Sequence, residues 1–578
     1  MKRKLACALA ALVTVSAFGV LTACGTGDDS KGGVAYTKVM SSQTKKAIGV
    51  DETVTYDVDK DLGGKEYLRL RLTTDVDLLG SFVYESVENR DTLITEEFFI
   101  EKSNGTDVVE FKQFLDSFRY NGVGQVAERN ATGGFDSHIF EKTLKKITFT
   151  NKSEVAGNFQ VENLSVADRV VPDFEREVYI EKDNLKVGAD LGVGGTLTYL
   201  ERTSYQRETV DEVITADGHV YIGVDAKSKE GAKHKSSHVN LINIYDQGRQ
   251  FQQSYYANVG GTSADTHDKM VALGCYNGQM PPDYGANGYE RGWCKTGDPE
   301  GDGYYWPYNP VQGGDVARNS SQIIDYEITD NQIYVKTRAM DWGKGDDGSH
   351  LPGTVVGGVT TKSYMENWYT ITNGMLRVKN RFIDWNGFTD MENVPEHSNE
   401  LPAAYVSHPL HNYVCYEGTM PWTNGELTYD GECTSWVRDA HRSYNPAEGW
   451  FAWVNDDDLE DLGGFGVGVY IPNTKVYVSG RCNTSTLANA LGNKDAYSAP
   501  CATTYRFNKP AATYPQMSCY VGNTSYTAPV VSWKMRTYEA MEYEYAIAVD
   551  YVRIMREQFH ELYESQTLLN KSWEKWLA

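Results

Sequence analysis

The front part of the chain contains short runs in which apolar and polar residues alternate. In the run 67–72, leucine alternates with tyrosine or arginine, which is the period-two pattern of a half-buried strand. Similar runs lie at 97–100, 108–111 and 145–149. Gly, Asn and Asp separate these runs. Short strands spaced in this way predict a jelly-roll-like β-sandwich.

The back part of the chain carries further strand patterns and one helical pattern. The strand patterns lie at 364–371, 376–382, 465–470 and 475–478. After Asp550, a candidate N-cap, apolar residues recur at spacings of three and four. These residues are Val552, Met555, Phe559 and Leu562. The chain is therefore predicted to be all-β, with one clear helix near its C-terminus.

A change of pattern near residue 180 predicts a domain boundary. Pro172-Asp173-Phe174 interrupts the strand pattern, and a new run begins at Glu177. All twelve tryptophans lie after this point. A chain of this length is too long for one compact core. We expect a signal peptide at 1–23, a polar tether at 24–45, a β-sandwich at 46–180 and a larger β domain at 181–578.

The first residues have the order of a bacterial secretory leader. A basic start, Met1–Lys4, is followed by the apolar run Leu5–Val20. Leu21-Thr22-Ala23-Cys24 then resembles a lipobox, the motif at which the leader is cut and the new N-terminal cysteine is lipidated. The apolar run is short for a membrane span. We expect the mature protein in the cell envelope, facing outside the cytoplasm and held to the membrane only by lipid on Cys24. An ordinary signal peptide is the alternative.

The charge of the chain narrows the choice of partners. The formal net charge is −24, whereas nucleic acids and anionic membranes bind basic surfaces. We therefore expect no nucleic-acid partner. A strongly anionic polysaccharide is also disfavoured as a substrate.

The late cysteines fall into three pairs of similar spacing. The pairs are Cys275 with Cys294, Cys415 with Cys433, and Cys482 with Cys501, and Cys519 is left over. An exported chain can oxidise such pairs. Zinc is the rival interpretation, but no CxxC or HxxxH pair has ligand spacing. The spacing favours disulfides, and sequence alone does not fix their connectivity.

A polar strand pattern at 243–256 is the first candidate for function. Read as a strand, it places alternate residues on one face. These are Tyr245, Gln247, Arg249, Phe251, Gln253 and Tyr255. Aromatic rings stack on the C–H faces of sugars, and amides and guanidinium groups bind their hydroxyls. The composition favours a sugar-binding surface, and a solvated sheet face is the alternative.

The second candidate is the segment that contains His397 and Glu400. An apolar Leu-Pro-Ala-Ala-Tyr run follows Glu400, so partial burial would raise the pKa of its carboxyl group. His408 and His411 follow closely. Imidazole and carboxylate groups are the usual partners in acid–base chemistry. The alternatives are a structural Glu400 and structural histidines.

Aromatic loops and acidic clusters complete the candidates. Trp306 and Trp422 lie in Pro-containing loops of the kind that wall a glycan cleft. The acidic clusters at 298–303 and 456–458 could hold calcium, although solvated turns are the favoured interpretation. We therefore expect no cofactor and no dedicated metal site.

Several motifs in the back part resemble the galactose-mutarotase-like β-supersandwich domains of carbohydrate-active enzymes. They are GGTLTYL at 194–200, INIYDQGRQFQQSYY at 242–256, WPYNPVQGGD at 306–315, HSNELPAAY at 397–405 and FGVGVYIP at 465–472. The resemblance covers about residues 175 to 570 and identifies no specific family. It implies a β-supersandwich in which His, Glu, Arg and Tyr project into a sugar cleft. His397, Glu400, Arg249 and Tyr255 are the positions that fit those roles.

The resulting hypothesis is an extracellular, lipid-anchored glycoside hydrolase that acts on a neutral or weakly charged polysaccharide or oligosaccharide. Glu400 would act as acid or base, with Asp315 or Glu366 as the second carboxylate that glycoside hydrolysis needs. The sugar-binding residues would be Arg249, Gln253, Tyr255, Trp306, Trp422, His408 and His411. A polysaccharide lyase with a Tyr or His base and a non-catalytic glycan-binding lipoprotein are the alternatives. If the chain is a hydrolase, the segments around Arg249 and Glu400 should meet on one concave β surface.

Overall fold

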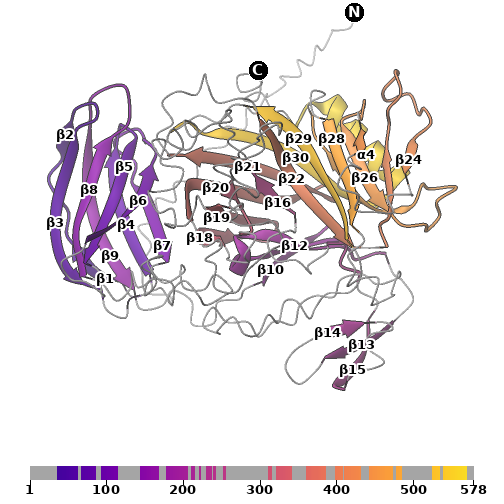
Figure 1. The fold of residues 1–578 in the computed structure, drawn as a ribbon, viewed down its shortest axis with the longest axis horizontal. Helices are drawn as coiled ribbons and strands as arrows, with labels where there is room; N and C mark the ends of the chain where they lie inside the picture. Colours follow the sequence, from indigo (N-terminus) through magenta and orange to yellow (C-terminus); the bar gives the residue numbers. More distant parts are fainter. Residues whose placement is uncertain are drawn as a thin grey trace, which may run out of the picture.

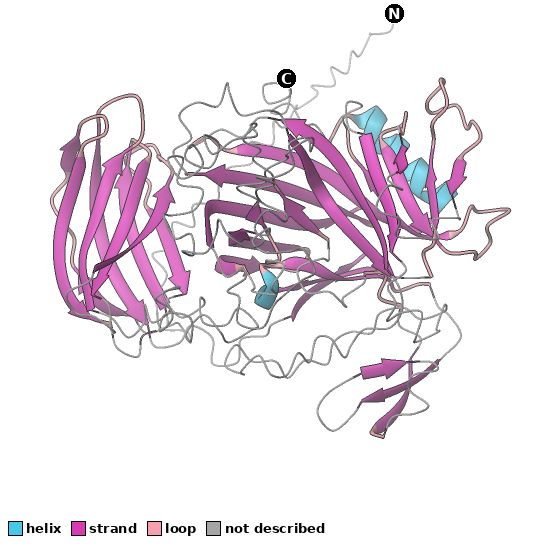
Figure 2. Ribbon diagram, viewed as in Figure 1, coloured by secondary structure: helices cyan, strands magenta, loops and turns pink. Residues whose placement is uncertain are grey.

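The computed structural model describes two β domains with little helix (Figure 2). It describes residues 36–62, 65, 67–85, 93–114, 143–167, 177–205, 210–214, 220–222, 230–236, 239–242, 251–255, 310–314, 321–341, 360–385, 397–407, 409–430, 442–444, 446–472, 477–483, 524–533 and 538–568. Within these residues the sheets are antiparallel and the one α-helix is α4 (Val552–Ser565). The all-β fold class predicted from the sequence is confirmed.

The N-terminal domain is a sandwich of two sheets. One sheet has the order β1-β9-β4-β7, with β2 also on β9, and the other has the order β3-β8-β5-β6. The strands are β1 (Thr37–Met40), β2 (Lys46–Ile48), β3 (Thr53–Asp61), β4 (Tyr67–Thr74), β5 (Leu78–Glu85), β6 (Leu93–Ile100), β7 (Val109–Phe114), β8 (Thr143–Asn151) and β9 (Gly157–Ala167). Strand pairing thus begins at Thr37, inside the segment expected to be a tether, because β1 completes a sheet edge on β9.

Stacked phenylalanines fill the core of the sandwich. The ring of Phe98 lies 4.4 Å from that of Phe82 and 4.6 Å from that of Phe111, centroid to centroid. Gly80 makes this stack fit, because a Cβ at this position would lie 2.2 Å from the Phe98 ring. The alternation seen in the sequence therefore places the aromatic face of each strand between the sheets.

The larger domain is built on one long sheet. Its order is β24-β23-β26-β27-β30-β21-β20-β19-β17-β16-β22-β29-β28-β25, with β18 on β19. Its strands are β16 (Gln252–Ser254), β17 (Pro310–Val311), β18 (Gln322–Ile328), β19 (Gln332–Asp341), β20 (Thr360–Thr372), β21 (Met375–Asp384), β22 (His397–Ser407), β23 (Asn412–Cys415), β24 (Thr428–Asp430), β25 (Arg442–Tyr444), β26 (Trp450–Val454), β27 (Phe465–Tyr470), β28 (Tyr477–Asn483), β29 (Thr524–Trp533) and β30 (Met541–Tyr551). Every pairing between these strands is antiparallel.

Two smaller sheets accompany the long one (Figure 1). The first has the order β10-β11-β12, and the second has the order β14-β13-β15. Their strands are β10 (Glu177–Lys182), β11 (Leu185–Asp190), β12 (Thr196–Arg202), β13 (Val210–Ile214), β14 (Val220–Ile222) and β15 (Ala232–Ser236). The 3₁₀ turn η4 (Leu191–Val193) joins β11 to β12, and Gly194 and Gly195 follow it in the left-handed backbone region, with φ of 65° and 67°.

The long sheet folds back on itself. β16 stands five strands away from β30 along the sheet, which would separate them by about 24 Å if the sheet were flat. The side chain of Gln253 on β16 nevertheless bonds with Tyr543 and Tyr545 on β30. Tyr255, just after β16, stacks on Phe382 of β21 with 3.9 Å between ring centroids. The two arms of the sheet therefore enclose a common core.

Helix α4 covers the outside of one arm. Its buried residues are Val552, Met555, Phe559 and Leu562, which are the residues whose spacing predicted it. The helix packs on β26, β27 and β30. Its N-cap is Tyr551 without a side-chain hydrogen bond, so the expectation of Asp550 as the cap is wrong. The Asp550 carboxylate instead contacts Arg202 at 3.2 Å.

The two domains meet through charged and apolar contacts. The N-terminal sandwich lies beside β18–β20, as its indigo-to-purple strands show in Figure 1. Three carboxylates on or just after β6 pair with cations of the larger domain. The pairs are Glu96 with Arg338, Glu97 with Lys362, and Glu101 with Arg381. Trp385 and Tyr364 of the larger domain join the core of the sandwich, so the domains share one continuous apolar cluster.

Replacing Glu96 with alanine should destabilise the protein by about 3–5 kcal/mol, because Arg338 would keep a buried charge without its partner. The Arg338 Nη1 to Glu96 Oε1 distance is 2.7 Å, and both side chains are at most 10% exposed. Urea unfolding followed by tyrosine and tryptophan fluorescence measures the loss.

The matched control is Glu110→Ala on β7. Its carboxylate lies 3.6 Å from Arg71 and is 34% exposed, so its loss should cost less than about 1 kcal/mol. Equal shifts for the two variants would show that the buried pair does not hold the domains together.

Candidate functional site

The two segments that the sequence singled out are neighbours in the structure. β16 pairs with β22, so that Gln252 lies opposite Ala403 and Ser254 lies opposite Glu400. β17 flanks β16 on its other side, with Val311 opposite Ser254. The end of the polar segment, Gln252–Ser254, therefore pairs with the strand that carries Glu400, and a common surface with Arg249 stays a prediction. His397 and Glu400 belong to β22 itself and not to a loop.

Part of the predicted site lies outside the described residues. This applies to Cys24, Arg249, Trp306, Asp315 and His408. For His397 and Glu400, the structure describes the backbone position in β22 and not the side chain. What the structure describes of the predicted site is therefore the backbone pairing of β16, β17 and β22.

Gln253 and Tyr255 lie in the interior, which corrects their assignment to an open sugar-binding surface. Gln253 is 1% exposed and Tyr255 is fully buried. The Gln253 amide donates to Asn367 Oδ1 at 3.3 Å, and its Oε1 accepts a hydrogen bond from the Tyr543 hydroxyl. The reason is the folding back of the long sheet, which covers this face of β16 with β20 and β30.

These residues belong to a buried tyrosine–amide network, defined as Gln253, Gln312, Asn367, Tyr369, Tyr543 and Tyr545. Gln312 Nε2 donates to the carbonyls of Gly194 and Gly195 and to the Tyr369 hydroxyl, at 3.0–3.1 Å. Burial raises the pKa of Tyr369, Tyr543 and Tyr545 above the ordinary value of 10.0. The phenols therefore stay protonated at neutral pH and act as neutral hydrogen-bonding groups.

Glu366 is locked in an ion pair and does not present a free carboxylate. Its Oε2 accepts from Arg381 Nη1 at 2.5 Å, and its Oε1 accepts from the Tyr334 hydroxyl at 2.7 Å. Burial raises the pKa of Glu366, but the charges of Lys336 and Arg381 outweigh it and hold the pKa at about 2. A group this acidic does not serve as a proton donor at neutral pH. Arg381 also contacts Glu101, so the group belongs to the domain interface.

His411 and Trp422 lie on different elements from β16 and β22. His411 Nε2 is 3.3 Å from Asp456 Oδ1, and its Nδ1 is 3.0 Å from the Pro409 carbonyl oxygen. Trp422 lies between β23 and β24, where its ring stacks on His560 of α4. Trp422 thus lies beside α4, and its predicted role in sugar binding, like that of His411, stays a prediction.

The structure describes the side chain of one of the paired cysteines, Cys415, and one of the two acidic clusters, at 456–458. Cys415 is a buried free cysteine in β23, so the predicted disulfide with Cys433 is absent at this residue. Burial raises the pKa of its thiol to about 12, as expected for an inert core cysteine. In the acidic cluster at 456–458, Asp456 accepts a hydrogen bond from Asn412 and Asp457 accepts one from Tyr551. The cluster at 298–303 and the other paired cysteines lie outside the described residues or have undescribed side chains.

Two further properties concern the described residues alone. Among them, no three His, Cys, Asp or Glu side chains gather in a way that would hold a metal ion. None of the described helices combines the length and apolar character that crossing a bilayer requires.

Comparisons with known proteins give structural matches only. No protein-family model matches the chain, and no curated protein matches it. A candidate aldose 1-epimerase from Escherichia coli K12 matches at 10% identity over 65% of this chain and 99% of its own, with a TM-score of 0.27. A galactose mutarotase related enzyme from Lactobacillus acidophilus matches at 10% identity over 64% and 97%, with a TM-score of 0.26.

A third match is the 4-alpha-glucanotransferase from Thermococcus litoralis, at 9% identity over 66% of this chain and 38% of its own, with a TM-score of 0.27. The matched structures include the mutarotase-like class that the sequence motifs resemble. Their low identities and TM-scores transfer no activity and no site residue to this chain.

The depressed pKa of Glu366 predicts a stability that depends on pH. Since the folded pKa is about 2 and the ordinary value is 4.5, the ion pair stabilises the protein above pH 4.5 by about 3 kcal/mol. This contribution is lost as the pH falls from 4.5 towards 2. Glu366→Gln should therefore be less stable than the wild type at pH 7, and the difference should shrink in that acid range.

Urea unfolding midpoints of both proteins, measured at intervals between pH 7 and pH 2, test this expectation. Other carboxylates titrate in both proteins, so their effects cancel in the difference. A difference that stays constant across the acid range would contradict the assigned ion pair.

Proposed function

We propose that this chain is a carbohydrate-active enzyme, and specifically a glycoside hydrolase that acts on a neutral or weakly charged glycan. The observation that supports it most is the pairing of β16 with β22, in which Ser254 stands opposite Glu400. In this register the partner of Glu400 is Ser254, which follows Arg249 by five residues in the chain. Acid–base and sugar-binding groups must lie within reach of one sugar ring. The pairing of Ser254 with Glu400 supports this for the backbones of β16 and β22 alone, since Arg249 lies outside the described residues.

Glu400 is proposed as the general acid or base. Glycoside hydrolysis needs two carboxylates that flank the scissile bond. With Glu366 held in its ion pair, Asp315 is the remaining candidate for the second carboxylate. Asp315 follows β17 by four residues, and β17 pairs directly with β16. The chain thus offers a second acid close in sequence to β17.

The proposal includes a lipid anchor on Cys24, because a basic start and an apolar run precede the lipobox-like motif that ends at this cysteine. Polymers must be cut outside the cell, which agrees with a protein tethered in the cell envelope. The proposed partners are therefore a polysaccharide or oligosaccharide, and the membrane through lipid alone.

Glu400→Gln should lower turnover by about 10²-fold or more with a modest change in affinity, because the amide keeps the shape but cannot transfer a proton. Arg249→Ala should instead weaken binding, turnover or both. Release of reducing ends from a cleaved glycan measures turnover, and calorimetric titration with its oligosaccharides measures affinity.

Glu327→Gln provides the matched control, because Glu327 is an exposed glutamate of β18. It should retain the turnover of the wild type. Full turnover in Glu400→Gln would remove Glu400 from the catalytic role.

Cys24→Ala should abolish lipidation, so the protein should appear in the medium or stay unprocessed. Fractionation of cells that express either form, followed by immunoblotting, measures this. Retention of the variant in the membrane fraction at the wild-type level would refute the anchor.

A further inference from the structure

Three aromatic side chains form a stacked, partly exposed group beside α4, which we call the aromatic platform. It consists of Trp422, His560 and Tyr563. The rings of Trp422 and His560 are nearly parallel, at 7° with 4.9 Å between centroids, and Tyr563 lies 5.3 Å from Trp422. Tyr563 is 46% exposed and the side chain of His560 is 39% exposed. Trp422 is partly buried, because it packs against the apolar cluster beneath α4 that includes Trp450 and Phe559.

The backbone of Trp422 adopts a conformation that is unfavourable for a bulky residue. Its φ is +63°, in the left-handed region. Such a conformation persists only when the surroundings fix it, and it occurs preferentially at functional positions. Here the Trp422 N–H donates to Glu448 Oε1 at 2.7 Å. Packing of a tryptophan against a helix does not by itself require this backbone.

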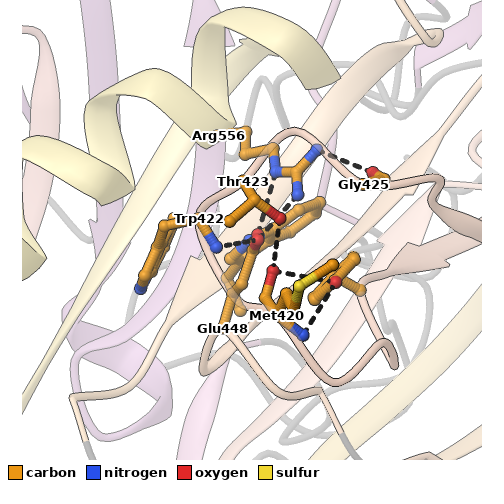
Figure 3. A network of polar contacts seen from close by, with 8 residues as sticks. Met420, Trp422, Thr423, Gly425, Glu448 and Arg556 are labelled. Atoms are coloured by element: carbon orange, nitrogen blue, oxygen red, sulfur yellow. Dashed lines mark hydrogen bonds and ion pairs between the residues drawn. The ribbon is translucent and has the colours of Figure 1, made fainter.

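A buried ion pair holds the Trp422 backbone in place (Figure 3). The Glu448 side chain is fully buried and receives Arg556 Nη2 at 2.6 Å and Nε at 2.9 Å. Its Oε2 also accepts from Trp450 Nε1 at 2.7 Å. Every oxygen of the buried carboxylate thus has donors, which is the condition for burying a charge. The pair links α4 to the Trp422 loop, so the three rings are fixed relative to one another.

The loop that carries Trp422 is fixed at further points. Arg556 Nη1 donates to the Gly425 carbonyl at 3.1 Å. The Tyr416 hydroxyl donates to the Met420 carbonyl at 2.9 Å and accepts from the Met420 N–H at 3.2 Å. Gly425 packs against the Tyr416 ring so closely that a Cβ would lie 2.7 Å from it. A platform that is rigid before binding loses little conformational entropy when a ligand arrives.

The chemistry around the platform suits an uncharged sugar. A pyranose ring has an apolar C–H face that stacks on aromatic rings and hydroxyls that donate to carboxylates and amides at its rim. Exposed groups of this kind flank the platform at Asn424, Glu561, Glu564 and Gln566. The carboxylates and the net charge of −24 disfavour an anionic ligand.

We infer that the aromatic platform is a second glycan-binding site, separate in its elements from the β16–β22 region, which holds a sugar unit of a neutral polysaccharide. This inference rests on the proposed carbohydrate function and extends it. The platform would bind polymer on α4 and the β23–β24 loop while other units of the same chain reach the β22 acid. Its role is binding, and it supplies no catalytic group.

Native electrophoresis in gels containing galactomannan, mixed-linkage β-glucan, arabinoxylan or soluble starch tests the inference. The wild type should be retarded by at least one polymer. Tyr563→Ala should weaken the apparent affinity for that polymer about tenfold, as expected for the loss of one aromatic contact. Trp422→Gly should do the same, because glycine suits a φ of +63° and removes only the ring.

Tyr179→Ala is the matched control, since Tyr179 is a 37% exposed tyrosine on β10, in another sheet. It should bind polymer as the wild type does. Thermal unfolding identifies any variant that fails to fold, and Tyr563→Ala decides the outcome if Trp422→Gly does not fold. Wild-type affinity in folded platform variants, or a wild type that none of the four polymers retards, would overturn the inference.

The readouts separate this inference from the proposed hydrolase activity. Retardation reports binding, whereas reducing ends report cleavage. Retardation that depends on the platform, without any cleavage by the wild type, would refute the hydrolase and leave the platform standing. Cleavage by the wild type, together with unchanged retardation of the platform variants, would support the hydrolase and refute the platform.

Discussion

The larger domain depends on satisfying polar groups that are buried between the two arms of its long sheet. Gln253 and Gln312 are buried, so their amides need hydrogen-bond partners in the interior. Those partners are tyrosines of β20 and β30 and the carbonyls before β12. Since hydrogen bonds are directional, they favour this way of folding the sheet back more specifically than apolar contacts alone would.

This constraint determines where function can lie. The face of β16 that carries Gln253 is used for structure, and Glu366 is used to join the domains through Arg381 and Glu101. Neither group is available to a substrate. The proposed acid Glu400 lies on β22, and the aromatic platform lies beside α4, so both proposals rest on groups outside this buried network.

The sequence predicted those parts of the fold that local patterns determine. The spacing of Val552, Met555, Phe559 and Leu562 identified α4 and its buried face, because a helix repeats within a few residues. The alternation in β4 and β21 likewise identified strands and their two faces. Alternation does not say which face is covered, however. The sequence therefore predicts a binding surface at Gln253 and Tyr255, although the return of β21 and β30 buries both residues.

Contacts between distant residues explain the other differences. Glu366 gave no local sign of its pairing with Arg381, which in turn contacts Glu101 in the other domain. The aromatic platform joins Trp422 to a helix more than a hundred residues later in the chain, so no local pattern in the sequence indicates the contact between Trp422 and His560. The alternating tyrosines of β30, Tyr543 and Tyr545, were a usable signal for the buried network. Their partners could be identified only once the sheet was seen to fold back.

The central claim of hydrolysis is tested most directly by incubating the purified protein with the neutral polysaccharide panel and with a uronate-containing polymer. New reducing ends and ultraviolet absorbance are followed together. Hydrolysis adds water across a glycosidic bond, so the account predicts reducing ends from a neutral glycan with no new absorbance. Absorbance from a newly formed carbon–carbon double bond would identify a lyase instead. Binding of polymer without any product would identify a non-catalytic glycan-binding protein, and either result would contradict the hydrolase.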